Sequence, residues 1–176
     1  MKMKKISAFI VALALITLAL ASCGGGIKYE DVDYREKGLS FTLPSSMRRS
    51  TVTDHDFEFS TLDAVFYADK VDYETVSEAG VEISESFDAE EYAIAITKTF
   101  DQDQLYFEED KENMRYSFRY TYGDTEAGES ETFFYVVVIG EVGNVWYIEM
   151  ICEQELSADY IPTFELWEKS IKTYME

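Results

Sequence analysis

Cysteine, histidine and proline are scarce in this 176-residue chain, and each shortage excludes a class of structure. The cysteines are Cys23 and Cys152, and the prolines are Pro44 and Pro162. With Cys23 committed to another role, no intramolecular disulfide can form, so the fold must rest on a hydrophobic core. One histidine, His55, is weak support for a transition-metal site or a nucleophile–imidazole couple, and a position in a polar surface loop is favoured.

Basic residues are also few: 15 Lys and Arg are outnumbered by 35 Asp and Glu, which gives a formal net charge of −20. Such a surface repels nucleic acid and anionic lipid headgroups, so neither is expected as a partner. The acidity is typical of a solvated surface that keeps an exported protein soluble. It also suits a basic protein, a cation or a cationic peptide. Disorder is not its cause, because aromatic residues make up 15% of the chain and hydrophobic residues 47%.

The chain begins with a cationic start, a short apolar run and small residues before a cysteine. Lysines in the first five positions precede apolar or small residues over 6–21, and the run closes as Leu20-Ala21-Ser22-Cys23. The run is shorter than the roughly 20 residues of a membrane-spanning helix. This order resembles the export signal of a bacterial lipoprotein, which implies cleavage before Cys23 and diacylation of that residue. The alternative is an ordinary signal peptide cut between Ala21 and Ser22, which leaves Cys23 as a free thiol.

The lipoprotein resemblance sets the expected domain boundaries and the expected location. Residues 1–22 are the signal peptide, 23–36 are the lipidated N-terminus and tether, and 37–176 form one globular domain. We expect the mature protein on the extracytoplasmic face of the cell membrane, held there by its lipid anchor. The expected partner is another envelope protein, and the oligomeric state stays open.

Alternating and apolar patterns predict mostly strands, with two helices. The predicted strands are 39–43, 57–59, 64–68, 105–107, 114–122, 133–139 and 145–152, of which 133–139 is apolar throughout and hence central. Asp88 as N-cap and Glu91 as its reciprocal partner predict a helix to about residue 99. A second helix begins near Ser157, with Pro162 in its first turn or so. Segment 69–87 is left open, with a strand at 81–83 as one alternative. This order favours an α+β fold with a mainly antiparallel sheet flanked by helices.

Short motifs then resemble PsbP-like domains. Gly38-Leu39-Ser40-Phe41-Thr42-Leu43-Pro44-Ser45 resembles their opening strand. The hairpin over 134–152 and the helix containing Tyr160-Ile161-Pro162-Thr163-Phe164 and Lys169-Ser170-Ile171-Lys172 resemble their end. DcrB-type bacterial lipoproteins share this layout behind a lipobox. The resemblance covers 37–176 by arrangement and implies an α/β/α sandwich in a family dominated by binding and accessory roles. No functional residue carries over by position.

An aromatic stripe on the strand 114–122 is the candidate ligand surface. Tyr116, Phe118, Tyr120 and Tyr122 share one face, and such rings would stack a sugar if they were exposed. The alternative, which is favoured, is that they pack beneath a helix. Arg48, Arg49, Arg115 and Arg119 are among the few cations. We expect them to pair with nearby carboxylates, and Arg48 and Arg49 are candidate contacts for an anionic ligand.

Catalytic chemistry finds little support in the sequence. Cys152 lies in an apolar strand, as a buried small hydrophobic residue would. The acidic clusters at 101–103 and 108–110 lack the spacing of a calcium loop. We therefore expect no catalytic residue, no metal and no cofactor. The leading hypothesis is a non-catalytic binding or accessory module of the cell envelope. A glycan or small-solute binding domain that uses the aromatic face is second, and an envelope hydrolase is third.

Overall fold

The computed structural model describes residues 30–100, 105–123 and 130–175. The expected signal peptide, Cys23 and the acidic cluster at 101–103 lie outside the described residues. Within the described ranges no helix is both long enough and apolar enough to cross a membrane.

Strands dominate the described chain, as the alternating patterns predicted. In order, the elements are β1 (Asp31–Glu36), β2 (Leu39–Pro44), β3 (Arg48–Arg49), β4 (Phe57–Ser60), β5 (Ala64–Lys70), α2 (Tyr73–Glu78), α3 (Ala89–Thr97), β6 (Tyr106–Asp110), the 3-10 helix η2 (Lys111–Asn113), β7 (Arg115–Tyr122), β8 (Thr132–Ile139), β9 (Trp146–Glu153), the 3-10 helix η3 (Gln154–Leu156), α4 (Ser157–Ser170) and β10 (Lys172–Thr173).

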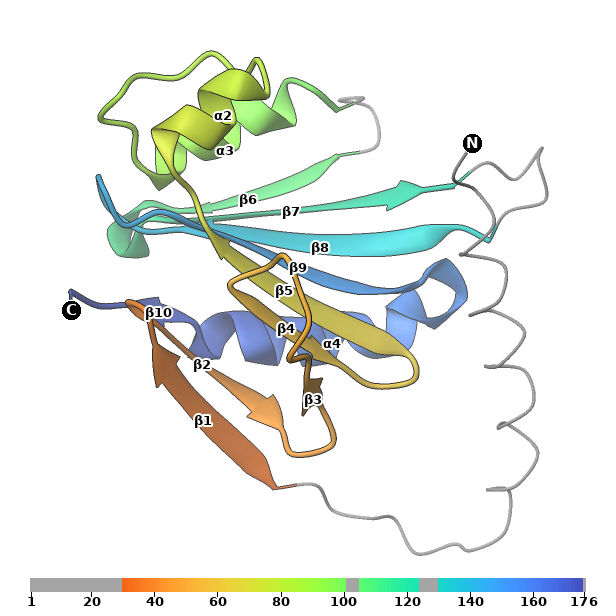
Figure 1. Ribbon diagram of the computed structural model, residues 1–176. Helices are drawn as coiled ribbons and strands as arrows, with labels where there is room; N and C mark the ends of the chain where they lie inside the picture. Colours follow the sequence, from red (N-terminus) through yellow and green to blue (C-terminus); the bar gives the residue numbers. More distant parts are fainter. Residues whose placement is uncertain (1–29, 101–104, 124–129, 176) are drawn as a thin grey trace, which may run out of the picture.

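The strands form two sheets in which every neighbouring pair is antiparallel. The larger sheet has seven strands in the order β3-β4-β5-β9-β8-β7-β6, and the smaller has three in the order β1-β2-β10. Figure 1 shows α2 and α3 over one face of the larger sheet, and α4 with the smaller sheet over the other. The expected α+β class with an antiparallel sheet flanked by helices is therefore confirmed.

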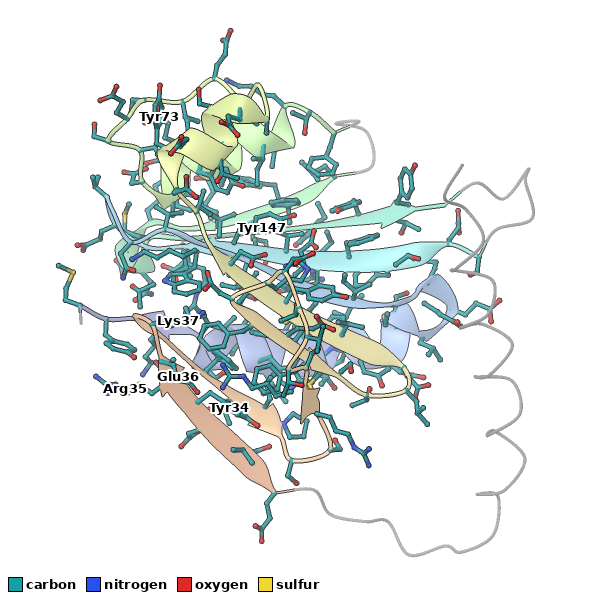
Figure 2. The ribbon with its side chains drawn as sticks, viewed as in Figure 1. Tyr34, Arg35, Glu36, Lys37, Tyr73 and Tyr147 are labelled. Carbon is teal, nitrogen blue, oxygen red and sulfur yellow. The ribbon has the colours of Figure 1, made fainter. Side chains whose placement is uncertain are left out.

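Two hydrophobic cores fill the spaces on the two sides of the larger sheet. Along β9, Trp146, Ile148 and Met150 point into the core beneath α4 and β2. The alternate residues Tyr147 and Glu149 lie on the side of α3, since neighbouring side chains of a strand point to opposite faces. Figure 2 shows the side chains that fill both spaces, with Tyr34 on the side of the smaller sheet and Tyr147 in the region of α3. The adjacent strand β8 is buried on both faces, as its apolar sequence predicted.

Helix α3 begins where its capping residue predicted. The Asp88 carboxylate accepts a hydrogen bond from the Glu91 backbone N–H at 3.0 Å, which satisfies one free donor of the first turn. The prediction that Glu91 bonds in return to the Asp88 backbone is wrong. The Glu91 carboxylate instead accepts from the backbone N–H and the hydroxyl of Ser84. It therefore ties the preceding loop to the helix.

The structure corrects the sequence analysis at three other places. Residues 31–36, expected in the tether, form β1 and pair with β2 along its length. The undecided segment 69–87 contains α2 and no strand at 81–83. Pro162 lies in the interior of α4, past the first turn, where its side chain is exposed. A proline has no N–H for the helical bond, so this position leaves one carbonyl of the first turn without its helical donor.

Replacing Phe41 by alanine should strongly destabilise the fold. Its ring is 2% exposed and lies 4.8 Å from the ring of Phe66 and 5.3 Å from that of Tyr34, so it joins the smaller sheet to the larger one. Because the substitution removes a whole buried ring and leaves a cavity, we expect a loss of about 3–5 kcal/mol in the free energy of unfolding measured in urea. The matched control Val52→Ala, at a side chain 90% exposed, should change stability by less than about 0.5 kcal/mol. A similar effect of both changes would contradict this packing.

Candidate functional site

The aromatic stripe of β7 is divided by the cover of α3. Tyr116 is 1% exposed and Phe118 is 0% exposed, and both belong to the core beneath that helix. Tyr120 is half-buried, and Tyr122 is 75% exposed. The hypothesis that the rings are exposed along the whole stripe is therefore wrong at Tyr116 and Phe118. The alternative of packing beneath a helix is correct there, because α3 crosses this part of the strand.

At the far end of the sheet, the aromatic stripe is no longer covered by α3. Figure 1 shows α2 and α3 over the end where β7 begins, and no described helix lies over the end where β7 finishes. The rings of Tyr120 and Phe134 stack there at 4.7 Å with an interplanar angle of 1°. Strand register continues this row from Phe134 to Ile151 and on to Val65. We call this surface the open face; its residues are Val65, Tyr67, Tyr120, Tyr122, Phe134, Glu149 and Ile151.

Glu149 is the one carboxylate among the residues of the open face. It lies beside Tyr67 in the strand register and accepts a hydrogen bond from the Tyr147 hydroxyl at 2.6 Å. Burial raises the pKa of Glu149, and the nearby Asp69 carboxylate raises it further, against the lowering effect of His55 and the Tyr147 hydrogen bond. An ionised carboxylate on a largely apolar surface destabilises the folded state, and such positions are enriched at functional sites.

His55 fixes a loop to the edge of this region. Its Nδ1 lies 2.6 Å from Asp69 Oδ2, and its ring lies 4.2 Å from the ring of Tyr67, tilted by 31°. The second oxygen of Asp69 accepts from the Asp56 backbone N–H at 2.9 Å. These contacts hold the 50–56 loop against β5, so the histidine has a structural role in a surface loop.

The phenols around Glu149 are hydrogen-bond donors at neutral pH. Burial, with the charge of Glu149, raises the pKa of Tyr92 to about 12. The same two causes raise the pKa of Tyr120 and of Tyr147. Because these hydroxyls stay protonated, the cluster can donate hydrogen bonds and stack, but the phenols supply no general base near pH 7.

The candidate arginines do not lie beside the aromatic stripe. Arg48 and Arg49 form β3, at the edge of the sheet opposite to β6 and β7. Arg49 is bound by Glu36 through two hydrogen bonds, of 2.8 and 3.2 Å. Arg48 is exposed and lines a surface hollow with Asp63 and Tyr160. The expected pairing with carboxylates holds for Arg49 and for Arg119, which lies 3.0 Å from Glu165, whereas Arg115 binds the Ile171 carbonyl. The expected ligand residues do not form one site.

Two further expectations concern Cys152 and metal ions. Cys152 is 4% exposed within the core beneath α4, which is the environment expected for it. Burial raises the pKa of its thiol to about 11, so it is not an activated nucleophile. Within the described ranges, no three His, Cys, Asp or Glu side chains converge as a metal site would require.

Comparison with known proteins identifies the fold. No protein-family model matches the chain, and no curated protein matches its sequence. The solution structure of cyanobacterial PsbP (CyanoP) from Synechocystis sp. PCC 6803 matches with a TM-score of 0.53 and 12% identity, over 88% of this chain and 99% of that one. The fold is PsbP-like. The crystal structure of the Ran-binding protein Mog1p from Saccharomyces cerevisiae matches with a TM-score of 0.54 and 6% identity, over 83% of this chain and 96% of that one.

These comparisons confirm the resemblance to PsbP-like domains at the level of the fold. At 12% and 6% identity they assign no residue role to this PsbP-like chain. The open face is therefore argued from its own geometry. The sequence analysis missed Glu149 because it has the same spacing in β9 as any solvent-facing residue of a half-buried strand. Tyr147 and Ile151, two positions away on the same face of β9, gave the only signal.

Replacing Glu149 by glutamine should stabilise the protein at neutral pH. The folded state holds the pKa of Glu149 above its ordinary value of 4.5. Ionisation therefore lowers stability as pH rises through that range. The free energy of unfolding of Glu149→Gln should exceed that of the wild type at pH 7, and the difference should vanish below about pH 4. The control Glu153→Gln, on the same face of β9 but exposed, should show a smaller difference. A gain that does not depend on pH would contradict the burial of this charge.

Cys152 should be unreactive until the protein unfolds. In a Cys23→Ser chain it is the single thiol, and burial with a pKa near 11 keeps it protonated. We expect Ellman's reagent at pH 8 to label the native protein at least roughly a hundredfold more slowly than the urea-unfolded chain. Equal rates in the two states would show that the core beneath α4 opens readily.

Proposed function

We propose that this chain is a non-catalytic binding or accessory module of the cell envelope. Acylated Cys23 anchors it to the extracytoplasmic face of the membrane, and the open face docks another envelope protein. The observation that carries the proposal is Glu149, a carboxylate held with a raised pKa on an incompletely covered aromatic surface. A surface that lowers the stability of its own fold is expected where binding has been favoured over stability.

The open face combines the features of a protein-docking surface. Tyr120, Phe134 and Ile151 form a half-buried apolar row that ends at the exposed ring of Tyr122. Tyrosine and phenylalanine are enriched in the centres of protein interfaces, where they bury a large area with little loss of side-chain freedom. Mog1p, which shares the fold, is described as a Ran-binding protein, so a precedent exists for protein binding by this architecture.

Charge favours a partner with basic residues around an apolar patch. The chain has a formal net charge of −20, and Glu58, Glu149 and Glu153 lie on or beside the open face. Opposite charge accelerates encounter and selects the orientation of docking. A lysine or arginine of the partner that reached Glu149 would also remove the penalty of its ionisation. The anchor supports the same proposal, since it confines the module to the surface where such partners are found.

The other two hypotheses have less support from the geometry. A glycan platform along the stripe would need Tyr116 and Phe118, and both are buried. A hydrolase would need converging ionisable groups with one free to act as a base. Around Glu149 the phenols are protonated donors, and His55 is bound to Asp69. A binding surface therefore fits the described residues best.

Disrupting the open face should abolish partner capture without affecting the anchor. We expect in-cell crosslinking and co-purification of the wild type to recover specific envelope proteins. Tyr122→Asp should reduce their yield at least about tenfold, because it replaces the exposed ring at the end of the apolar row with a charge. Leu166→Asp is the matched control, since Leu166 is 67% exposed on α4, on the other side of the sheet, and should leave capture unchanged.

The anchor is tested separately by Cys23→Ser. We expect this variant to leave the membrane fraction and to lose the same partners, because tethering raises their effective concentration. Equal capture by Tyr122→Asp and the wild type would contradict docking at the open face. An unchanged membrane fraction for Cys23→Ser would contradict acylation of this residue.

A further inference from the structure

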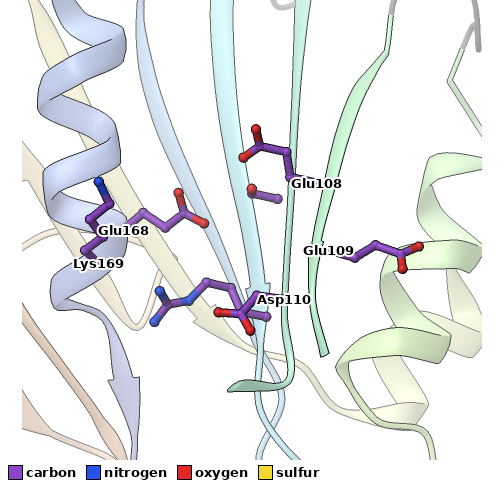
Figure 3. A pocket seen from close by; sticks show the side chains of 7 residues that line it. Glu108, Glu109, Asp110, Glu168 and Lys169 are labelled. Carbon is purple, nitrogen blue, oxygen red and sulfur yellow. The ribbon is translucent and has the colours of Figure 1, made fainter. Parts of the chain in front are cut away.

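Two surface hollows adjoin α4, one near its end and one near its start. Figure 3 shows the first, between the end of α4 and the edge strand β6. Its lining residues are Glu108, Glu109, Asp110, Arg115, Ser117, Glu168 and Lys169, so four carboxylates outnumber two cations. Such a lining repels phosphate groups. The hollow near the start of α4 has no such excess, since its lining contains one cation and one carboxylate.

Arg48 is the cation of this second hollow, and its guanidinium is available to a ligand. Its side chain forms no ion pair with any described residue, although acidic residues outnumber basic ones more than twofold in this chain. Its neighbour Arg49 is bound by Glu36 instead. The other lining residues are mostly hydroxyl-bearing: Ser46, Ser60, Thr61 and Tyr160, with Leu62 and Asp63. A free guanidinium beside hydroxyl groups is suited to donate hydrogen bonds to a phosphate.

Leu62 lies at the rim of this hollow, on the turn between β4 and β5, and its side chain is 62% exposed. The turn is closed by its own hydrogen bonds. The Thr61 backbone N–H donates to the Ala64 carbonyl at 2.8 Å, and the Thr61 hydroxyl oxygen accepts from the Ala64 N–H at 3.0 Å. Because the backbone is already fixed, moving this side chain out of water costs little additional chain entropy.

The chain leads from this hollow directly to Cys23. The Ser45 backbone N–H donates to the Glu30 carbonyl at 2.8 Å, so Glu30 is fixed beside Ser46 of the lining. Seven peptide bonds join Cys23 to Glu30, and a chain of that length spans at most about 25 Å. An acyl group on Cys23 would therefore hold this end of the domain close to the bilayer.

Strand register places a comparable exposed side chain, Val142, at the opposite end of the larger sheet. Ala64 pairs with Cys152 and Lys70 pairs with Trp146, so the β4–β5 turn and the β8–β9 turn are separated by the length of β5, about 20 Å. Figure 1 shows these two turns at opposite sides of the molecule. Val142 is 59% exposed. Exposure alone therefore does not distinguish the two ends, whereas the distance from Cys23 does.

We propose that the end of the domain formed by Arg48, Leu62 and Tyr160 rests on the surface of a phospholipid bilayer without net charge. Leu62 inserts among the headgroups, Arg48 donates to a lipid phosphate, and the ring of Tyr160 lies at the interface, where tyrosines are enriched. The net charge of −20 would repel an anionic bilayer. This inference rests on the proposed anchor at Cys23. The open face starts at Val65, three residues after Leu62, so this seating places it beside the membrane.

A tryptophan reporter tests this proposal in the lipid-anchored protein, reconstituted into phosphatidylcholine vesicles with brominated acyl chains. The native Trp146 and Trp167 are 0% and 7% exposed, so an added tryptophan dominates any change in quenching. Leu62→Trp should be quenched at least about threefold more strongly than the matched control Val142→Trp, because bromine atoms quench only a ring that reaches the bilayer. Equal quenching at the two positions would overturn the proposal.

A second substitution tests the phosphate contact. Arg48→Gln, added to Leu62→Trp, should lower the quenching about twofold, since it removes a charged hydrogen bond to the headgroup. Arg48 is exposed, so this change should leave the fold intact. Lys172→Gln is the matched control, because this exposed lysine pairs with Ser40 near the start of β2, away from the hollow. Unchanged quenching in Arg48→Gln would overturn the contact with lipid phosphate.

A maleimide lipid separates this test from the test of the anchor. If Cys23 is not acylated, its thiol can be coupled to a maleimide lipid in the same vesicles, while Cys152, 4% exposed, stays unlabelled. The coupled Leu62→Trp protein should then be quenched more strongly than the coupled Val142→Trp protein, as with the acyl anchor. Equal quenching after coupling would overturn the seating on the bilayer, whereas a missing acyl group alone would overturn only the proposed anchor.

Discussion

The alternation of side chains along β9 is the constraint on which the rest of the structure depends. This strand lies inside the larger sheet, between β5 and β8. Trp146, Ile148 and Met150 bury one face of it without exposure to solvent, so α4 and the smaller sheet must cover that side. The other face carries Tyr147 and Glu149, which α3 covers only in part. Cys152 is a free, buried thiol, so among the described residues packing holds these layers together without a disulfide.

The short length of α3 leaves the two faces of the sheet unequal. The core beneath it ends near Phe118, and beyond it the row from Tyr120 to Ile151 is half-buried. On the opposite side, α4 covers the middle of the sheet and leaves the floor of β7 open toward the edge strand β6. One surface is therefore aromatic, whereas the other is charged. Both surfaces exist because the helices do not cover the full width of the seven-stranded sheet.

Elements with local signals were predicted well, and elements held by distant contacts were not. The period of two in 114–122 and 145–152 predicted β7 and β9, and Asp88 predicted the start of α3. By contrast, β1 is charged and mostly exposed, and it becomes a strand because β2 supplies its hydrogen bonds. Pro162 lies inside α4 for a similar reason, since Phe164 and Trp167 pack into the core and outweigh the lost backbone bond.

The sequence by itself determined the class of fold, the faces of the main strands, the strongly acidic surface and the resemblance to a lipoprotein export signal. These properties depend on spacing and composition, which are local. Only the tertiary structure decided which rings are covered. Tyr116 and Tyr122 belong to the same alternating pattern, but α3 covers Tyr116 and leaves Tyr122 exposed. The tertiary structure alone placed Tyr67 beside Glu149, because β5 and β9 are far apart in the chain and pair only in the folded sheet.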